Sequence, residues 1–287
     1  MAIRIQLQGG LGNQLFVWAM AHEIVKQTQE RVELLYLKDR NSRDDRPIEI
    51  FDLLSFCNEN ISIHQVSWPS RVFRVIDKLA TIDRFNTIDF AKLLGIRTMK
   101  ETFDVPETFT GTKLLRGYFQ NKNMVESLRE SISTEIQDYL KVIRDPENPF
   151  GRKRDLVIHI RRGDTTHLVR EWGILEYEYY RRNLGDHQDI TVVTDDARYT
   201  SEIEAYFPGA EILTPNICDS WQTLKLMANA RHLIMANSTL SWWSGWLMSH
   251  NMEQCTFPYP WRPGNIEITE KLIFRNTTLS SSEFRDT

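Results

Sequence analysis

LVIHIRRGD (residues 156–164) joins a run of apolar, strand-forming residues to two arginines and a carboxylate. In open α/β sheets, ligands bind at the carboxyl ends of the strands, which is where these charges fall. Because side chains alternate along a strand, Arg161 and Arg162 cannot both enter one core face, and we expect at least one to project into a crevice. A guanidinium fork suits a bidentate oxyanion such as phosphate, and Asp164 is a candidate acid, base or orienting group. Solvated charges at a surface strand end are the simpler alternative.

Strand-like and helix-like segments alternate through the second half of the chain, which indicates βαβ crossovers and a doubly wound parallel sheet. The predicted strands are 156–160, 190–194, 211–214, 232–236 and 254–257, and the predicted helices lie near 176–184, 198–206, 220–230 and 239–250. The first half gives strands at 3–7, 31–37 and 114–119, a helix through 16–24 and one long helix over 121–143, with weaker signals over 40–110. The run 144–151 contains proline and glycine and marks a domain boundary. We therefore predict two α/β halves, 1–150 and 151–287, with a cleft between them.

Composition and charge exclude several classes of protein. The formal net charge is −4 and the pI is near 6.0, which argues against a nucleic-acid groove filled by basic residues. The sequence has no uncharged apolar run of about eighteen residues, the length needed to cross a membrane, and its first residues lack the apolar core of a signal peptide. Cys57, Cys218 and Cys255 are far apart, which predicts buried free thiols in a reducing cytosol. We therefore expect a cytoplasmic protein that binds no nucleic acid.

A glycine-rich turn follows the first predicted strand. Gly9, Gly10 and Gly12 precede Asn13 at the start of a helix, where backbone N–H groups and the positive helix end can hold an anion or a sugar diphosphate. The turn lacks the third glycine of the dinucleotide fingerprint, because Leu15 stands there, and it lacks the Lys-Ser/Thr of a P-loop. An NAD enzyme and a P-loop NTPase are therefore poor interpretations. A glycine turn required only for its geometry is an equal alternative.

Two acids follow the strand predicted at 190–194. Asp195 and Asp196 can accept hydrogen bonds from ribose hydroxyls or from the N1–H and exocyclic amine of guanine. Alternatively, one of them caps the helix expected near residue 198. A carboxylate pair could also indicate a metal ion, but no Asp-x-Asp occurs in the sequence, and no His or Cys lies beside the pair at ligand spacing. The pair therefore does not indicate a metal site, and we expect the protein to use no metal and no cofactor.

Residues 236–246 (ANSTLSWWSGW) follow another predicted strand and open a helix. Asn237, Ser238 and Thr239 are strong N-cap types, and the hydroxyls and nearby amides could receive a phosphate. Core packing explains the three tryptophans better than sugar stacking does. His159, like His22, is a lone histidine, for which a hydrogen-bonded core position is the commoner outcome. The neighbouring arginines add weight to a ligand role for His159.

Together these segments resemble the bacterial α-1,2-fucosyltransferases, glycosyltransferase family 11. The matching runs keep the family's order and span nearly the whole chain: residues 9–16, 117–120, 159–164, 194–196 and 236–247. The sequence departs from the family at Val17, Trp18, Leu240 and Ser244-Gly245. These departures bear on the choice of acceptor more than on donor chemistry.

The resemblance implies a GT-B-like fold with two Rossmann-like domains facing a cleft. The acceptor-side domain would span 1–150 and the GDP-sugar-binding domain 151–287. The implied reaction is an inverting, metal-independent transfer of L-fucose from GDP-L-fucose to the 2-hydroxyl of a terminal galactose, in an oligosaccharide or an O-antigen-type glycan. The His-x-Arg-Arg-x-Asp element is shared by α-1,2-, α-1,6- and protein O-fucosyltransferases, so it supports the donor more firmly than the acceptor linkage.

Breaking the fucose–phosphate bond places negative charge on the β-phosphate of the departing GDP, which fixed cations must stabilise if no divalent ion is present. We expect Arg161 or Arg162 to contact this phosphate, while the other arginine holds Asp164 or the domain interface. The remaining donor-binding candidates come from the other matching runs: His159, Asp195 and Asp196 for ribose and guanine, Asn237, Ser238 and Thr239 for the phosphates, and Gly10, Gly12 and Asn13 for the sugar and diphosphate.

The sequence offers two acids for the catalytic base. Asp164 is nearest to the arginines, Glu171 is the alternative, and water or the phosphate itself could take the proton.

Residues 68–79 carry basic groups around an apolar helical stripe. They either contact the inner face of a membrane, where they would reach a lipid-linked acceptor, or cover part of the acceptor-side domain. The rival functions are a transferase for another nucleotide sugar, such as a UDP-hexose, and a non-catalytic nucleotide- or glycan-binding protein.

Overall fold

The computed structural model describes residues 2–37, 47–56, 59–66, 95–99, 101–143, 153–163, 172–249 and 254–285. Several predicted features lie outside these residues: the basic segment 68–79, the boundary 144–151, Cys57, and the candidate bases Asp164 and Glu171. Among the helices of the described ranges, none combines the length and the apolarity needed to span a membrane.

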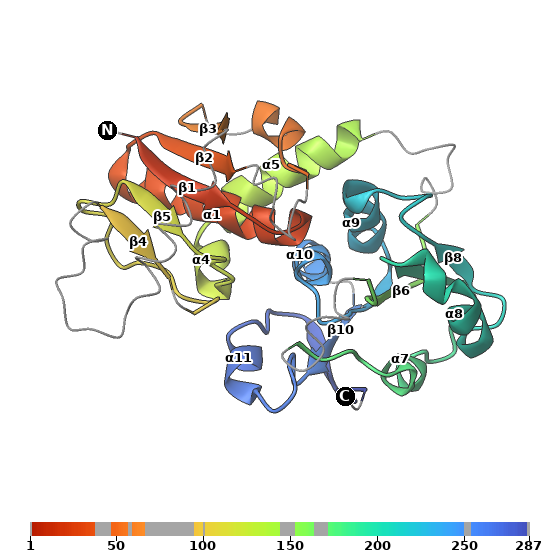
Figure 1. Cartoon of the computed structure of the whole chain (residues 1–287). Coiled ribbons are helices and arrows are strands. Elements are labelled where there is room, and N and C mark those ends of the chain that lie inside the picture. The colour runs from red at the N-terminus through yellow and green to blue at the C-terminus, as the bar shows by residue number, and fades with distance from the viewer. Residues whose placement is uncertain are drawn as a thin grey trace. The chain divides into compact units, whose positions relative to one another are not determined.

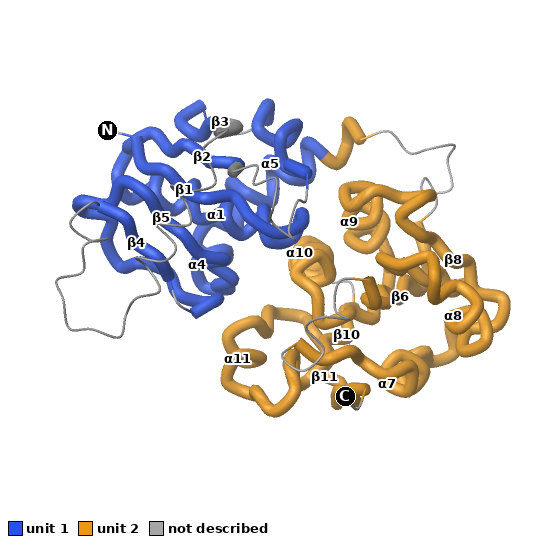
Figure 2. The backbone as a smooth tube through the Cα atoms, viewed as in Figure 1, with its two compact units in different colours: residues 1–139 blue, residues 140–287 orange. Residues whose placement is uncertain are grey.

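The chain divides into two compact units, residues 1–139 (unit 1) and 140–287 (unit 2) (Figure 2). The division falls within helix α5 (Arg129–Val142), so the last residues of that helix belong to unit 2. Each unit contains its own parallel β-sheet.

Unit 1 is built on a five-stranded sheet in the order β3-β2-β1-β5-β4, with every neighbouring pair parallel. Its strands are β1 (Ile3–Leu7), β2 (Val32–Leu37), β3 (Ile61–Val66), β4 (Ile96–Thr98) and β5 (Leu114–Arg116) (Figure 1). Its helices are α1 (Leu11–Thr28), the 3₁₀ helix η1 (Asp52–Phe56), α4 (Lys122–Ser127) and most of α5. The strand order reverses between β1 and β5, a point at which open α/β sheets bind ligands.

The predicted long helix over 121–143 is wrong, because the chain forms two helices, α4 and α5, in its place. Leu128 separates them with φ −111° and ψ 7°, outside α-helical geometry. Its side chain is nevertheless buried, as are those of Val125 and Ile132. Apolar residues therefore continue at spacings of three and four positions across the break at Leu128, so their periodicity could not predict where one helix ends and the next begins. Strands β3 and β4 lie in the region where the sequence signals were weak.

Unit 2 is built on a six-stranded sheet in the order β11-β10-β9-β6-β7-β8, again with every neighbouring pair parallel. Its strands are β6 (Leu156–Ile160), β7 (Ile190–Thr194), β8 (Glu211–Leu213), β9 (His232–Ile234), β10 (Gln254–Tyr259) and β11 (Thr277–Ser281). Its helices are α7 (Tyr177–Arg182), η3 (Ala197–Tyr199), α8 (Thr200–Tyr206), α9 (Ser220–Ala228), α10 (Thr239–Met248) and α11 (Ile266–Glu270).

The doubly wound parallel sheet predicted for the second half is confirmed. β6 and β7 have the predicted bounds, and every side chain of β6 is buried, as expected of a central parallel strand. The sequence did not predict α11 or β11. The residues of β11, TTLSS, are largely exposed at the sheet edge, so they lack the apolar run that marks the inner strands.

The tryptophans of α10 lie in the core of unit 2, as predicted. Trp242, Trp243 and Trp246 are fully buried, and the rings of Trp242 and Trp246 stack with 6.3 Å between their centres. The indole N–H of Trp242 donates to the Leu272 carbonyl at 2.8 Å, so the polar group of this ring is satisfied within the core. This packing fixes α10, and therefore fixes the position of its N-terminus.

Cys218 and Cys255 are free and buried, as predicted for both. Burial raises the pKa of the Cys218 thiol to about 11 and raises that of Cys255 as well. Both thiols are therefore protonated at neutral pH, and neither supplies a thiolate nucleophile.

Replacing Trp246 with alanine should lower the free energy of unfolding by about 3–5 kcal/mol, because it removes a fully buried ring and leaves a cavity that its neighbours fill only in part. Urea unfolding followed by circular dichroism measures the change. Ile266→Ala, at a position that is 51% exposed, is the control and should change the free energy by less than about 0.5 kcal/mol. Equal effects of the two substitutions would contradict the placement of Trp246.

Candidate functional site

Strands β6 and β9 are neighbours in the unit 2 sheet although β7 and β8 separate them in the sequence. Their register pairs Ile158 with Ile234. After β6 the chain continues to one side of the sheet through β7 and β8, and after β9 it continues to the other side through β10 and β11. Open α/β folds bind ligands at the carboxyl ends of such a pair. The segments that leave this point, 161–163 and 236–239, are two of those that the sequence singled out.

The two arginines after β6 have different surroundings, as strand alternation predicts. Arg162 is completely buried. Its Nη1 donates to the Leu175 carbonyl at 2.8 Å, and its guanidinium carbon lies 4.6 Å from the centre of the Tyr177 ring. The side chain of Arg161 is 23% exposed, and its Nε lies 4.0 Å from Oδ2 of Asp195. Of the two, Arg161 is therefore placed to meet an oxyanion, whereas Arg162 makes contacts within the core.

The carboxylate of Asp195 organises the backbone that follows β6. Its Oδ1 accepts hydrogen bonds from the backbone N–H of Arg162 at 2.6 Å and of Gly163 at 3.0 Å. A Cβ at Gly163 would lie 3.2 Å from Oδ2 of Asp195, so a side chain there would crowd this contact. Because Oδ2 also faces Arg161, Asp195 positions the loop and the arginine together.

Asp196 caps the 3₁₀ helix η3, which is the simpler of its two predicted roles. It accepts a hydrogen bond from the backbone N–H of Arg198 at 3.0 Å and pairs with the guanidinium of the same residue through both carboxylate oxygens. These hydrogen bonds lower the pKa of the Asp196 carboxyl. Asp196 is buried and both its oxygens are engaged, so its placement does not favour a direct nucleoside contact.

His159 is a buried histidine that links β6 to α10. Its Nδ1 lies 2.5 Å from Oγ of Ser241, and the same hydroxyl accepts from the backbone N–H of Ala236 at 3.2 Å. Burial, and to a smaller extent the charge of Arg161, lowers the pKa of His159 to about 3. The imidazole is therefore neutral at physiological pH. Its placement favours the core histidine over the predicted contact with ribose or guanine.

Ser238 and Thr239 stand where α10 begins. Ser238 is the N-cap, as its residue type predicts, and its Oγ accepts from the backbone N–H of Leu240 at 3.3 Å. Thr239, the first residue of the helix, is partly exposed. The positive end of the α10 dipole therefore lies at the carboxyl edge of the sheet, the edge from which Arg161 emerges.

Asn237 holds a segment that the sequence did not single out. Its Nδ2 donates to the carbonyls of Trp172 and Gly173, at 2.9 and 3.3 Å. The guanidinium carbon of Arg262 lies 3.3 Å from the centre of the Trp172 ring, so a cation–π pair adjoins this contact. Trp172 and Arg262 belong to no motif and no periodic run, so no local signal could have paired them.

The glycine turn of unit 1 has a geometric requirement at its first residue. Gly9 has φ +74°, and a Cβ there would lie 2.5 Å from Nδ2 of Asn13. Oδ1 of Asn13 accepts from Nε2 of Gln120 at 3.0 Å, which joins the motifs 9–16 and 117–120 beside the switch between β1 and β5.

An acid of the chain itself lies at the N-terminus of α1. The backbone N–H of Leu11 donates to Oε2 of Glu49 at 2.7 Å. Gly10 is the N-cap of this helix and Gly12 is buried in its first turn. Because Glu49 uses one of the amides that an anion would need, a phosphate bound here would have to displace it.

The candidate residues thus fall into two groups, one in each unit. Unit 2 gathers Arg161, Asp195, Asn237, Ser238 and Thr239 at one edge of its sheet, with His159 and Arg162 buried behind them and Asp196 turned to Arg198. Unit 1 holds Gly10, Gly12 and Asn13.

No family model matches the chain. Two proteins of Escherichia coli are similar to it over most of their lengths. The O-antigen biosynthesis glycosyltransferase WbnK is 25% identical, over 90% of this chain and 94% of WbnK. An alpha-1,2-colitosyltransferase is also 25% identical, over 89% of this chain and 91% of that protein.

Among solved structures, the E. coli heptosyltransferase WaaC with ADP is similar in fold, with a TM-score of 0.50 and 11% identity over 98% of this chain and 93% of WaaC. The fold is GT-B. Each unit has the parallel α/β sheet that the family resemblance implied. The similarity to WbnK and to the colitosyltransferase supports a glycosyltransferase activity.

His159→Asn should make the protein less sensitive to acid. In the folded chain the imidazole stays neutral down to a pKa of about 3, whereas in the unfolded chain it is protonated near its ordinary pKa of 6.5. Between these values the unfolded state binds more protons, so the free energy of unfolding falls as pH drops, by up to about 1.4 kcal/mol per pH unit from this residue. Urea unfolding at about pH 7 and about pH 5 measures the difference between wild type and variant.

His64→Asn is the control for this experiment, because His64 is an exposed histidine on β3. It should keep the wild-type dependence on pH. The same loss of stability in the wild type and in His159→Asn would show that the imidazole of His159 is not held neutral in the core.

Proposed function

We propose that the protein is an inverting α-1,2-fucosyltransferase. It moves L-fucose from GDP-L-fucose to the 2-hydroxyl of a terminal galactose in a glycan of the O-antigen type. One observation carries the proposal: Arg161, partly exposed and beside Asp195, lies at the carboxyl end of β6 at the switch point of the sheet. Two relatives add support, since one is named for O-antigen biosynthesis and the other for an α-1,2 transfer.

The transition state needs most stabilisation at the β-phosphate, because this group gains negative charge as GDP leaves. Arg161 supplies a fixed cation for this charge, and Asp195 holds its loop in place before the donor binds. One preorganised donor of this kind contributes on the order of 3 kcal/mol. Ser238, Thr239 and the positive end of α10 offer further hydrogen bonds to the phosphate oxygens. In this proposal these groups do the work of a divalent ion, and no cofactor takes part.

The acceptor hydroxyl attacks the anomeric carbon from the face opposite GDP, which inverts that centre. The bond to the phosphate oxygen breaks as the new glycosidic bond forms, and GDP leaves with the electron pair. A base accepts the proton of the hydroxyl. We assign this role to Asp164, with Glu171 as the alternative. Both assignments come from the sequence alone.

The glycine turn and Asn13 are proposed to contact the sugar and diphosphate, again from the sequence. The hydrogen bond between Leu11 and Glu49 limits this proposal, because a phosphate oxygen and the Glu49 carboxylate would compete for the same amide. Asn13 retains its bond to Gln120 in either case if the ligand meets its amide nitrogen.

A second donor is favoured by one finding. The relative named as an α-1,2-colitosyltransferase is 25% identical to this chain, the same identity as WbnK, so a colitose nucleotide is the alternative to GDP-L-fucose. Groups that bind phosphates do not distinguish one sugar from another, so Arg161 serves either donor. A nucleotide- or glycan-binding protein without turnover is the remaining alternative.

Arg161→Ala should lower the rate of fucose transfer at least about 100-fold, because it removes the cation proposed to stabilise the leaving phosphate. Arg161→Lys should also be strongly impaired, since a single ammonium does not replace a planar fork. Thin-layer detection of fucosylated lactose, formed from GDP-L-fucose by the purified protein, measures both.

Arg181→Ala is the matched control, because Arg181 is an exposed arginine on α7. It should transfer fucose at the wild-type rate. Full activity of Arg161→Ala would refute the leaving-group role. A wild type that transfers colitose but not fucose would establish the alternative donor.

GDP should bind at least about tenfold more tightly than UDP, a difference of about 1.4 kcal/mol. Isothermal titration calorimetry of the wild type with GDP, UDP and GDP-L-fucose measures this selectivity. Transfer should persist in EDTA, because the proposed stabilising groups are all side chains and amides. Preference for UDP would indicate another nucleotide sugar, and loss of transfer in EDTA would contradict the metal-independent mechanism.

A further inference from the structure

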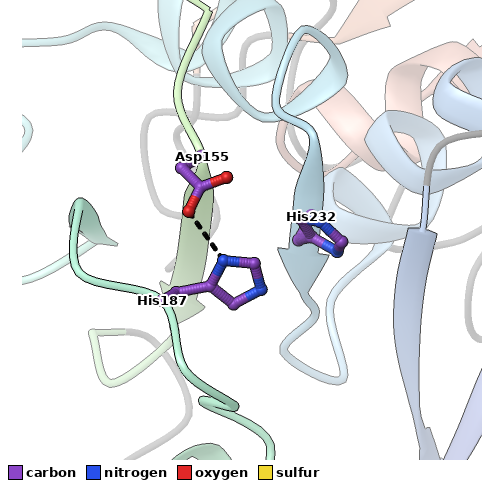
Figure 3. Close-up of side chains that lie close together, drawn as sticks. All are labelled: Asp155, His187 and His232. Carbon is purple, nitrogen blue, oxygen red and sulfur yellow. Dashed lines mark hydrogen bonds and ion pairs between the residues drawn. The ribbon is translucent and has the colours of Figure 1, made fainter.

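Asp155, His187 and His232 form a cluster of possible metal ligands in unit 2 (Figure 3). One ligand atom from each residue lies within 4.8 Å of the other two. Oδ2 of Asp155 and Nδ1 of His187 share a hydrogen bond of 2.7 Å, and the ring centres of His187 and His232 are 4.3 Å apart. The three side chains come from separate parts of the chain, so no short sequence motif announces them.

The sheet fixes the spacing of these ligands. Asp155 directly precedes β6, His232 begins β9, and the backbone N–H of His232 donates to the Asp155 carbonyl at 3.0 Å. His187 lies just before Asp189, whose carbonyl accepts from the first N–H of β6 at 3.3 Å. The strand ladder therefore fixes the backbone positions of Asp155 and His232, and it anchors the end of the loop that carries His187. A set positioned in this way favours metal binding.

Two imidazoles and one carboxylate are the ligand types that zinc prefers among common protein groups. The hydrogen bond from His187 lowers the pKa of the Asp155 carboxyl, so this ligand is ionised at neutral pH. The side chains of His187 and Asp155 are 23% and 34% exposed, which leaves access for an ion and for water. Ligand atoms of tetrahedral zinc stand about 3.4 Å apart. Atoms that are up to 4.8 Å apart must therefore draw together by up to about 1.4 Å through side-chain rotation, whereas Oδ2 of Asp155 and Nδ1 of His187, at 2.7 Å, must move apart if both bind the ion.

We propose that Asp155, His187 and His232 bind one zinc ion per chain, with water as the fourth ligand. A zinc ion that binds Nδ1 of His187 takes the place of the hydrogen bond to Asp155, and the neutral imidazole then carries its proton on Nε2. Arg231 lies close enough to act on Asp155. Its positive charge opposes the ion and keeps the affinity moderate.

This site is separate from the proposed transfer reaction. Its ligands lie at the amino ends of the strands, whereas Arg161 follows the carboxyl end of β6, and the five residues of that strand span about 16 Å. A zinc ion here would tie the loop before β7 to the two central strands. We therefore assign it a stabilising role, in which the ion binds the folded chain and raises its melting temperature.

The test uses the whole chain without a histidine tag, stripped of metal with EDTA and then dialysed. Zinc chloride is titrated in competition with a chromophoric zinc chelator, and melting is followed by differential scanning fluorimetry. The wild type should take up one zinc ion per chain and melt at a higher temperature with zinc than without. His187→Ala and His232→Ala should bind zinc at least about tenfold more weakly. Magnesium should not shift the melting temperature, because it prefers oxygen ligands.

Asp155→Asn separates a loss of zinc binding from a failure to fold, which could also explain weak binding by the two histidine variants. Its amide oxygen can still accept the hydrogen bond from His187, so it should fold like the wild type yet bind zinc at least about tenfold more weakly. His64→Ala, which removes an exposed histidine of unit 1, should bind zinc like the wild type. Failure of the wild type to bind, or equal binding by Asp155→Asn, would overturn the proposal. Sugar transfer does not enter this test, so its outcome is independent of the proposed function.

Discussion

The reversal of strand order between β6 and β9 is the constraint on which the candidate site depends. It places the exits of two strands side by side although β7 and β8 lie between them in the sequence. A parallel sheet has helices over both its faces, so polar side chains that must meet a ligand gather at its carboxyl edge. Unit 1 repeats this arrangement between β1 and β5, where Asn13 meets Gln120. In both units the sheet topology, and not any single motif, assembles the polar groups.

Most polar groups around this point support one another and do not face outward. Asp195 binds the backbone after β6, and Asn237 binds the backbone of the segment that begins at Trp172. The bond between His159 and Ser241 ties the central strand to α10. Each contact restrains a segment at the carboxyl edge of the sheet, so the backbone that carries Arg161 is positioned by hydrogen bonds within the protein. Such restraint is the condition under which a fixed charge stabilises a transition state effectively.

The sequence predicted the inner strands well, because β6 (LVIHI) and β7 (ITVVT) are rich in β-branched apolar residues and lead directly into charged residues. It could not assign the two neighbouring acids, since only the backbone path decides that Asp195 faces the loop while Asp196 caps η3. The partners of His159 and Asn237 lie far away in the sequence, where periodicity carries no information. The sequence did not predict the cluster of Asp155, His187 and His232 for the same reason, because its three members are far apart in the sequence. In a parallel sheet, neighbouring strands are joined by long crossover connections, so residues that touch across the sheet are far apart in the sequence.

The length of β6 matters as much as its composition. Inserting or deleting one residue in this strand would turn every later side chain to the opposite face. The guanidinium that now meets solvent would be driven inward, and the buried guanidinium of Arg162 would lose the Tyr177 ring. The hydrogen bond between the backbone N–H of His232 and the Asp155 carbonyl would also be lost. The number of residues in β6 therefore fixes the orientation of the polar groups at both its ends, the group that includes Arg161 and the group that includes Asp155. We expect this number to tolerate less change than the identity of the apolar residues within the strand.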